Sequence, residues 1–215
     1  MVFFIPAGWC SGLSPVDTHE RGRVAVDFEK RVRGMIKSRE SGPPAAIHES
    51  TKRRRDMKVY EASLDEATLE KLIRFSQDWE AENSCHGYRA NDRSDIEGNR
   101  VFLAEEDGEI VGYLFGKADR TSGSMKSIMP EGTAIFEVEE LYVVPEKRSR
   151  GIGSELFRLA ESAVGDGAEY MVLSTATKNW KAILHFYLEE LGMEFWCATL
   201  YRKLPGKKSA RNGNG

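Results

Sequence analysis

Residues 141–157 read LYVVPEKRSRGIGSELF, an apolar run followed by a basic turn with two glycines and then an amphipathic segment. The run before Pro145 predicts a β-strand, and the apolar spacing after Gly153 predicts an α-helix. Between a strand and a helix, free backbone N–H groups and the positive end of the helix dipole converge, which suits a phosphate group. The stretch therefore predicts either a tight turn without a ligand or a phosphate-binding loop.

The spacing of the glycines excludes two common phosphate-binding loops. A Walker A loop requires Gly-Lys-Ser/Thr, whereas Gly153 precedes Ser154 and Glu155. A dinucleotide-binding fingerprint requires a third glycine where Leu156 stands. What remains is the pair Gly151 and Gly153, whose missing Cβ atoms would let a pyrophosphate approach the backbone closely.

The rest of the chain predicts an α/β fold. Asp107-Gly108 between two apolar runs indicates a β-hairpin, and Ser63 followed by Glu66 indicates a helix start with a capping box. The apolar run 168–177 is typical of a strand at the centre of a sheet. We expect a mixed β-sheet of six to seven strands flanked by helices on both faces. The expected strands are 57–63, two runs within 100–118, 133–145, 168–177 and one or two in 193–204, and the expected helices are 63–83, 154–167 and 179–192.

The two ends of the chain differ from this domain in composition. Residues 1–56 are rich in Ser, Gly, Pro and charge, which predicts a poorly ordered or partly helical extension with one helix near 24–37. The run KRRR at 52–55 suits a solvated surface, because so short a basic patch binds nucleic acid weakly without a wider basic face. We expect a folded domain over 57–204 and a flexible tail over 205–215.

The overall composition narrows the class of protein. The 215 residues carry a formal net charge of −3, which argues against nucleic acid or anionic membranes as partners. Cys10, Cys85 and Cys197 are widely separated, which indicates a reducing compartment rather than a disulfide scaffold. No run approaches the ~18 apolar residues of a membrane span. The expected location is therefore the cytoplasm.

Two segments in this order resemble the GNAT superfamily of N-acetyltransferases. The quoted stretch is similar to the family's acetyl-CoA segment, in which a strand is followed by Arg/Gln-x-x-Gly-x-Gly/Ala and a helix. Residues 179–193, NWKAILHFYLEELGM, are similar to the family's following helix, with Asn179 near its start and Tyr187 eight residues later. Met193 replaces the Phe that commonly follows the glycine at 192. The resemblance covers the whole expected domain and implies a GNAT-like sheet and acetyl transfer.

The resemblance also implies acetyl-CoA as the cosubstrate and assigns residues to it. The backbone of Leu141 to Val143 would hold the pantetheine arm as an added strand, and an N–H near Val143 would serve the oxyanion. The glycines would hold the pyrophosphate, and Asn179 is either part of this site, a helix N-cap, or both. The implied cofactor-binding residues are Leu141, Tyr142, Val143, Arg148, Ser149, Arg150, Gly151, Ile152, Gly153, Ser154, Asn179 and Tyr187.

Acetyl transfer to an amine requires a base, because an amine with a pKa of about 10.4 must lose a proton before it attacks the thioester. Strict alternation along the strand places Glu137 and Glu139 on one face and Glu140 on the other. By its distance from the glycines, Glu137 matches the general base of the family's histone-acetylating branch, and Glu139 is the second choice. Tyr187 would protonate the thiolate; its alternative role is a core aromatic of its helix.

The acceptor is expected to be a primary amine, on a small cationic molecule or on a protein. A cationic amine would suit the acidic residues Asp78, Glu80, Glu82, Asp92, Asp95 and Glu97. Two alternatives stay open: a regulatory module that binds acyl-CoA without turnover, and an RNA contact through the run 52–55. A homodimer is also open, since dimers are frequent in the family. The four histidines show no spacing typical of a metal site.

Overall fold

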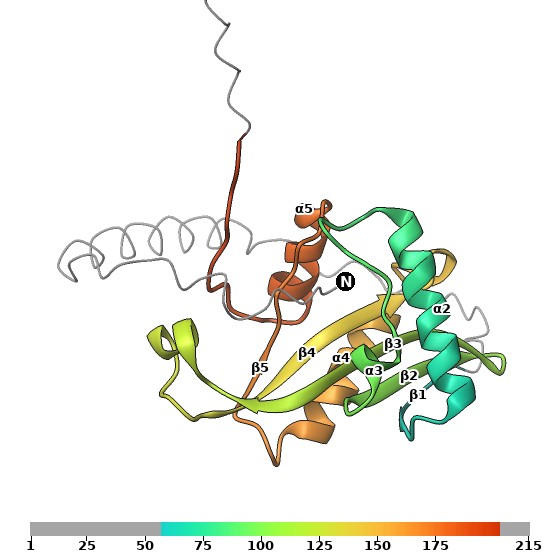
Figure 1. Ribbon diagram of the computed structural model, residues 1–215, viewed down its shortest axis with the longest axis horizontal. Helices are drawn as coiled ribbons and strands as arrows, with labels where there is room; N and C mark the ends of the chain where they lie inside the picture. The colour runs from blue at the N-terminus through green and yellow to red at the C-terminus, as the bar shows by residue number, and fades with distance from the viewer. Residues whose placement is uncertain (1–56, 203–215) are drawn as a thin grey trace, which may run out of the picture. The chain divides into compact units, whose positions relative to one another are not determined.

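The computed structural model describes residues 57–202 (Figure 1). The expectations for the extension 1–56, including its helix and its basic run, and for the tail 205–215 lie outside the described residues. The chain divides into two compact units, one that ends at Trp180 and one that begins at Lys181. Each unit is described by itself below.

Five strands of the first unit form one mixed sheet in the order β1-β2-β3-β4-β5. Strands β1 to β4 are antiparallel to their neighbours, and β5 runs parallel to β4. The predicted mixed α/β architecture is confirmed, although the described residues hold five strands rather than six or seven. The strands are β1 Met57–Ala62, β2 Arg100–Glu106, β3 Glu109–Arg120, β4 Ala134–Val143 and β5 Tyr170–Val172.

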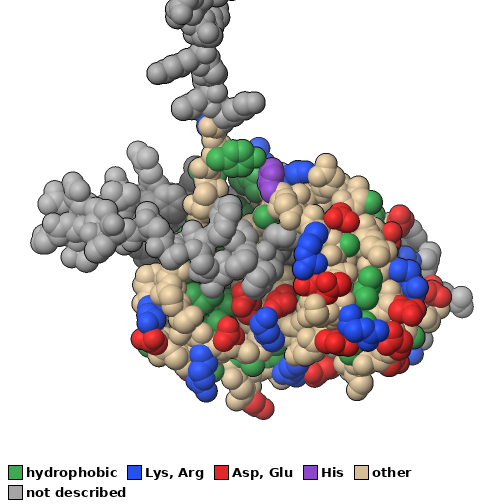
Figure 2. Space-filling view, in the orientation of Figure 1, with side chains coloured by type: hydrophobic (Ala, Val, Ile, Leu, Met, Phe, Trp, Pro, Cys, Tyr) green, Lys and Arg blue, Asp and Glu red, His purple; other side chains and the backbone are tan. Residues whose placement is uncertain are grey.

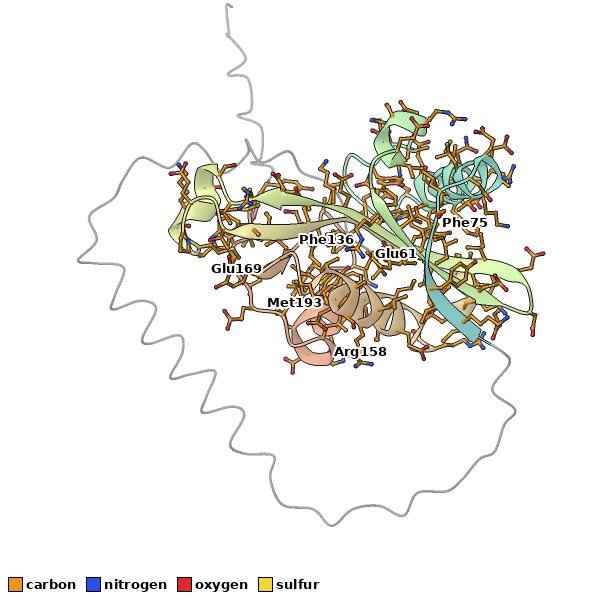
Figure 3. The ribbon with its side chains drawn as sticks, turned by 90° about the horizontal axis from the view of Figure 1, so that it is seen from below. Glu61, Phe75, Phe136, Arg158, Glu169 and Met193 are labelled. Carbon is orange, nitrogen blue, oxygen red and sulfur yellow. The ribbon has the colours of Figure 1, made fainter. Side chains whose placement is uncertain are left out.

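Helices cover both faces of this sheet, as predicted. Helix α4, Ile152–Val164, contacts β1, β2, β3 and β4 on one face. Helix α2, Glu66–Glu82, and the short α3, Arg93–Ile96, lie on the other face. Figure 3 shows α2 with Phe75 on one side of the sheet and α4 with Arg158 on the opposite side. No helix within residues 57–202 is long and apolar enough to cross a membrane.

The packing of α2 explains its amphipathic sequence. Leu69, Leu72, Phe75 and Trp79 repeat at helical spacing and are buried against aromatic side chains of β3 and β4. The predicted cap of this helix is wrong, because Asp65 and not Ser63 accepts the free N–H of Thr68. Asp65 stands next to the first helical residue, where a side-chain oxygen reaches the first turn directly. The aromatic partners in the core are Tyr113, Phe115 and Tyr142.

The hairpin predicted at Asp107-Gly108 is confirmed. Both residues have positive φ angles, 56° and 83°, which is the backbone of a two-residue turn with the twist that antiparallel strands need. The loop between β3 and β4 contains a 3₁₀ turn, η2, at Gly123–Ser127, and a second one, η3, occupies Pro145–Lys147 after β4. Strand β4 therefore ends before Pro145, as predicted.

A β-bulge interrupts the pairing of β3 with β4. Phe115 pairs with Glu140 and Gly116 pairs with Val138, so Glu139 is an extra residue on β4. A Cβ added at Gly116 would lie 2.2 Å from the carbonyl oxygen of Glu137, so only glycine fits opposite the bulge. The bulge shifts the alternation of β4 by one residue.

This shift overturns the prediction that Glu140 faces away from Glu137 and Glu139. Glu140 pairs with Phe115, whose side chain lies in the α2 core, and Glu137 pairs with Lys117 two residues further along β3. Directly opposite residues share a face, so Glu137 and Glu140 both face the α2 side. Glu139 forms an ion pair with Lys117 and turns to the same side. The strict period of two fails here because the strand carries one residue too many.

The prediction for residues 168–177 is also corrected. β5 is three residues long and lies at the edge of the sheet, not at its centre. It pairs with β4 only at Ile135–Glu137, after which the two strands part. Beyond β5 the chain bridges to the segment after α2, where Cys85 and Thr177 form an isolated antiparallel bridge. The pairing thus ends two residues before the bulge at Glu139.

The second unit contains the predicted helix around Tyr187. Helix α5, Trp180–Leu184, crosses the unit boundary and continues as a π-helix, η4, at His185–Glu190. Gly192 has φ 71° and follows the last turn as the predicted C′ residue, with Met193 N–H donating to the Tyr187 carbonyl. The strands predicted in 193–204 are wrong for residues 193–202, which form none. A strand needs a paired neighbour, and alternation alone does not supply one.

The bulge yields a stability prediction. Gly116→Ala should destabilise the protein by about 2 kcal/mol, because its methyl group would overlap the Glu137 carbonyl and the Phe136 ring. Urea denaturation of both proteins measures the difference. The control is Gly167→Ala, where the carbonyl oxygen of Val164 lies 3.8 Å from the added Cβ. That change should stay within about 0.5 kcal/mol of the wild type. Equal stability of the two variants would contradict the tight packing at the bulge.

Candidate active site

The carboxyl half of β4 exposes backbone groups along one edge. Because β5 stops at the partner of Glu137, no strand of the described residues pairs with β4 from Val138 to Val143 on the edge opposite β3. Val144 N–H donates to the Val111 carbonyl, so Val144 and, two residues earlier, Tyr142 direct their N–H and C=O groups toward β3. The residues on either side of Tyr142 direct theirs to the other edge. Leu141 and Val143 therefore present their backbone groups at the open edge. Tyr142, between them, faces β3 with its backbone and the α2 core with its ring.

The loop after β4 leads directly into a helix N-terminus. We call residues 148–154 the glycine loop. Ser149 and Gly151 have positive φ angles of 57° and 83°, and α4 begins at Ile152. No side chain caps this helix start, and Glu155 is the first residue whose N–H returns to the Gly151 carbonyl. The N–H groups of the first turn are thus available to an anion, and a Cβ at Gly151 would meet open space.

The basic side chains of this segment form ion pairs within the chain. Arg148 makes two hydrogen bonds to the carboxylate of Glu82, at 2.7 and 2.8 Å. Arg150 donates to Glu106 at 2.7 Å, and Lys147 pairs with the same carboxylate. The predicted phosphate-binding loop thus offers its backbone toward the helix N-terminus, while these three side chains contact Glu82 and Glu106.

Three carboxylates gather at the bulge, and we call Glu137, Glu139 and Glu140 the carboxylate face. Glu137 is half-buried, and burial, followed by the charge of Glu139, raises its pKa, while Lys117 opposes the shift. Glu139 pairs with Lys117, and this contact raises the pKa of the ammonium group. Carboxyl groups with raised pKa values suit proton transfer near neutral pH.

Glu140 is the most enclosed of the three, with 5% of its surface exposed. The hydroxyl of Tyr113 donates to its carboxylate at 2.8 Å, and that of Tyr88 donates at 3.2 Å. Burial raises the pKa of Glu140 to about 7, against the hydrogen bonds from Asn91 and the two tyrosines, which lower it. Sequence reasoning missed this residue because the period of two assigned it to the other face.

The segments that follow α2 and β5 are joined by hydrogen bonds. His86 N–H donates to the Ala176 carbonyl and Lys178 N–H donates to the Ser84 carbonyl, both at 2.9 Å. Asn179 follows this junction, precedes α5 and donates its own N–H to the Thr177 hydroxyl at 3.1 Å. Asn179 thus directly precedes the first residue of α5, and both roles predicted for it, N-cap and cofactor contact, stay predictions.

Tyr187 belongs to the second unit and lies in the π-helix η4. It is buried, and its ring meets the ring of Phe186 edge-on at 4.9 Å between centroids. The core role considered for this tyrosine agrees with its burial. Its role toward the thiolate stays a prediction.

Glu82 and Glu106 contact the glycine loop but are not among the residues that the sequence predicts for the cofactor site. Glu82 was expected on the acceptor side, as one of the acidic residues that suit a cationic amine, and Glu106 was given no role. Each lies more than forty positions from its basic partner, so only the folded sheet brings them together. The sequence holds one signal, for Glu106: a glutamate ends an apolar strand. The structure shows this residue buried, and a buried carboxylate needs partners.

Comparison with known proteins identifies the family. A model described as the acetyltransferase (GNAT) family matches residues 61–193. The chain is also 31% identical over 108 residues to an uncharacterized N-acetyltransferase, YhfO, of Bacillus subtilis (strain 168). That alignment covers 48% of this chain and 68% of the relative. The family match includes β4, the glycine loop and the helix with Tyr187.

Solved structures share the fold at low sequence identity. An aminoglycoside acetyltransferase, meta-AAC0020, from an uncultured soil metagenomic sample has a TM-score of 0.50 at 21% identity, covering 69% of this chain and 97% of its own. A putative acetyl transfer enzyme from Pyrococcus furiosus has a TM-score of 0.50 at 16% identity, covering 69% and 100%. These likenesses show the fold alone. With the family model matched over residues 61–193, the chain belongs to the GNAT family and is an acetyltransferase.

Proposed function

We propose that this protein transfers an acetyl group from acetyl-CoA directly to a primary amine. The GNAT family generally uses acetyl-CoA as its cosubstrate. The observation that carries the proposal is the combination at the end of β4: an open backbone edge at Leu141 and Val143, followed by a helix start with free N–H groups. An extended amide chain that ends in a pyrophosphate matches both features in that order.

In this proposal the backbone does most of the cofactor binding. The stretch Leu141 to Val143 would lie beside the pantetheine arm as a short added strand, with the N–H and C=O of Leu141 pairing with its amides, since the Val143 carbonyl accepts Arg148 Nε. The N–H groups of the first turn of α4, from Ile152 to Ser154, would bind the pyrophosphate together with the helix dipole. The N–H of Val143 would also donate to the oxyanion of the tetrahedral intermediate. Asn179 and Tyr187 remain the proposed contacts from the following helix, with Tyr187 as the acid that protonates the thiolate.

Glu137 is the proposed general base, and Glu139 the second candidate. Glu137 is half-buried with a raised pKa, which suits a base that must accept a proton from an amine near neutral pH. Glu139 contacts Lys117, an interaction that a proton acceptor would first have to release. The transfer balances as follows: the ammonium group loses one proton to the carboxylate, the neutral nitrogen forms the C–N bond, and the C–S bond breaks as Tyr187 protonates the thiolate. The nitrogen loses its second proton as the amide forms, and this proton replaces, through solvent, the one that Tyr187 gave up.

The acceptor is proposed to be cationic, but not because of the acids on α2 and α3. Figure 2 shows acidic and basic side chains interspersed over one face of the molecule. Asp95 pairs with Arg89, and Arg93 pairs with both Glu66 and Glu97. Because these carboxylates already have cationic partners, the carboxylate face at the bulge is the better candidate for attracting a positively charged amine. Both a small polyamine-like molecule and a lysine side chain meet that requirement.

Acetyl-CoA binding through the glycine loop can be tested by thermal unfolding. Ligand at 100 times Kd should stabilise the wild type by about 2.7 kcal/mol, a shift of several degrees in Tm. Gly151→Asp should abolish the shift, because it places a negative charge and a strained backbone at the helix start. Gly98→Asp is the matched control, since both glycines have φ near the same value, 83° and 84°, and open space around them. A full shift in Gly151→Asp would exclude the loop as the phosphate site.

The base assignment predicts a loss of rate without a loss of cofactor affinity. Glu137→Gln should lower kcat by about 10²-fold or more, with the Kd for acetyl-CoA nearly unchanged. CoA release would be measured with a polyamine, an aminoglycoside and a lysine peptide as acceptors. The exposed Glu131→Gln serves as control and should leave the rate unchanged. Undiminished turnover in Glu137→Gln would move the role to Glu139, whereas binding without any turnover in the wild type would favour the non-catalytic module.

The buried Glu140 predicts a specific pH dependence of stability. Its pKa lies at about 7 in the folded protein against an ordinary 4.5, so the folded state holds the proton more tightly. Stability from this group is complete below the ordinary value and falls as pH rises through about 7. Each unit of pKa shift corresponds to about 1.4 kcal/mol.

Glu140→Gln cannot ionise, so the difference in unfolding free energy between variant and wild type should grow by a few kcal/mol over that range. Urea denaturation from about pH 4 to about pH 8 measures it, with Glu131→Gln as the exposed control. A constant difference across this range would show that Glu140 keeps an ordinary pKa.

A further inference from the structure

Glu106 holds two basic residues of the connection between β4 and α4. It is the last residue of β2, and 2% of its side chain is exposed. Its carboxylate accepts a hydrogen bond from Arg150 at 2.7 Å and pairs with Lys147 on its other oxygen. These two contacts lower the pKa of Glu106 to about 2, so the carboxylate stays ionised at neutral pH. The pair therefore fixes the connection on both sides of Arg148 and Ser149.

Glu82 binds Arg148, which lies between Lys147 and Arg150. It is the last residue of α2, and both of its oxygens accept N–H groups of Arg148. Arg148 Nε also donates to the carbonyl of Val143 at 2.8 Å, which joins the loop to the open edge of β4. The hydroxyl of Tyr142 donates to Glu82 as well, at 3.3 Å. Two carboxylates from elements outside the loop thus fix both of its arginines, Arg148 and Arg150, and the preceding Lys147.

The residue between these anchors has an unfavourable backbone conformation. Ser149 lies in the left-handed region with φ 57°, and it is flanked by Arg148 and Arg150. A non-glycine residue persists in that region only where its surroundings determine the backbone. The left-handed conformations of Ser149 and Gly151 direct the chain into α4, so the ion pairs help to set the direction of the first N–H groups of that helix.

We propose that Glu106 and Glu82 are positioning residues for phosphate binding: they hold the glycine loop in the conformation that presents its backbone N–H groups, without contacting the cofactor. This inference rests on the proposed function. A competing account makes Lys147, Arg148 and Arg150 the direct phosphate ligands, with the two glutamates as competitors. The accounts predict opposite signs, since removing a competing carboxylate would tighten binding and removing a positioning one weakens it.

The test compares a thioester with and without phosphates. Isothermal titration calorimetry gives Kd values for acetyl-CoA and for S-acetylpantetheine, which has the same acetyl group and pantetheine arm but no nucleotide. Glu106→Gln and Glu82→Gln should each weaken acetyl-CoA binding about tenfold, the scale of one charge-assisted hydrogen bond. Binding of S-acetylpantetheine should stay within about twofold. Glu109→Gln is the control for the change in net charge, because its side chain is 78% exposed.

The outcomes separate the inference from the function on which it rests. Unchanged or tighter acetyl-CoA binding in Glu82→Gln and Glu106→Gln would overturn the positioning role, and so would an equal loss for both thioesters. In each case the wild type still binds acetyl-CoA, so the proposed function stands. A wild type that binds neither thioester would overturn both. Glu82 is the less buried of the two residues, so its variant supplies the result if Glu106→Gln does not fold.

Discussion

The candidate site depends on one extra residue in β4. Before the bulge the Ala134 carbonyl points toward β5, where it accepts the N–H of Glu169. An uninterrupted strand would therefore direct the backbone of Glu140 and Tyr142 to that side. The bulge at Glu139 reverses the alternation, so that Leu141 and Val143 present their backbone groups there and Tyr142 enters the core. Gly116 makes the bulge possible, because a side chain there would overlap the backbone of β4.

Near the loop, the charged side chains and the backbone groups have different partners. Side chains with charge near the loop contact each other: Glu82 with Arg148, and Glu106 with Arg150. At the open edge the Val143 carbonyl accepts Arg148 Nε, and the backbone groups that we propose for the cofactor are those of Leu141, the Val143 N–H and the N–H groups at the start of α4. A binding site made of backbone groups changes little with side-chain substitution, and its geometry is set by the elements that hold it. In our proposal the ion pairs therefore act through the conformation of the loop rather than through its net charge.

The sequence predicted local features well and long-range pairing poorly. The turn at Asp107-Gly108 follows from the backbone preferences of its own residues, so it was predictable. The helix after the glycines was predicted as well, although α4 begins at Ile152, two residues before the predicted start at 154. The face of Glu140 was not, because a bulge adds a residue without changing the apolar pattern around it. The strands predicted in 193–204 had the right alternation, yet residues 193–202 form none. Alternation describes a strand that already has a neighbour, and the neighbour is a property of the fold.

The carboxylate face also bears on the acceptor. Three carboxyl groups lie there, and among the described residues Lys117 is the cation that contacts Glu139 and acts on Glu137. Burial opposes ionisation, and the nearby charge of Glu139 adds to this effect, so the pKa values of Glu137 and Glu140 are raised and both hold protons more readily than exposed carboxyl groups do. A cationic amine would reverse that balance, since a positive charge nearby favours the ionised carboxylate. Its arrival would thus help to ionise the base that must then deprotonate it, which favours a charged amine over a neutral acceptor.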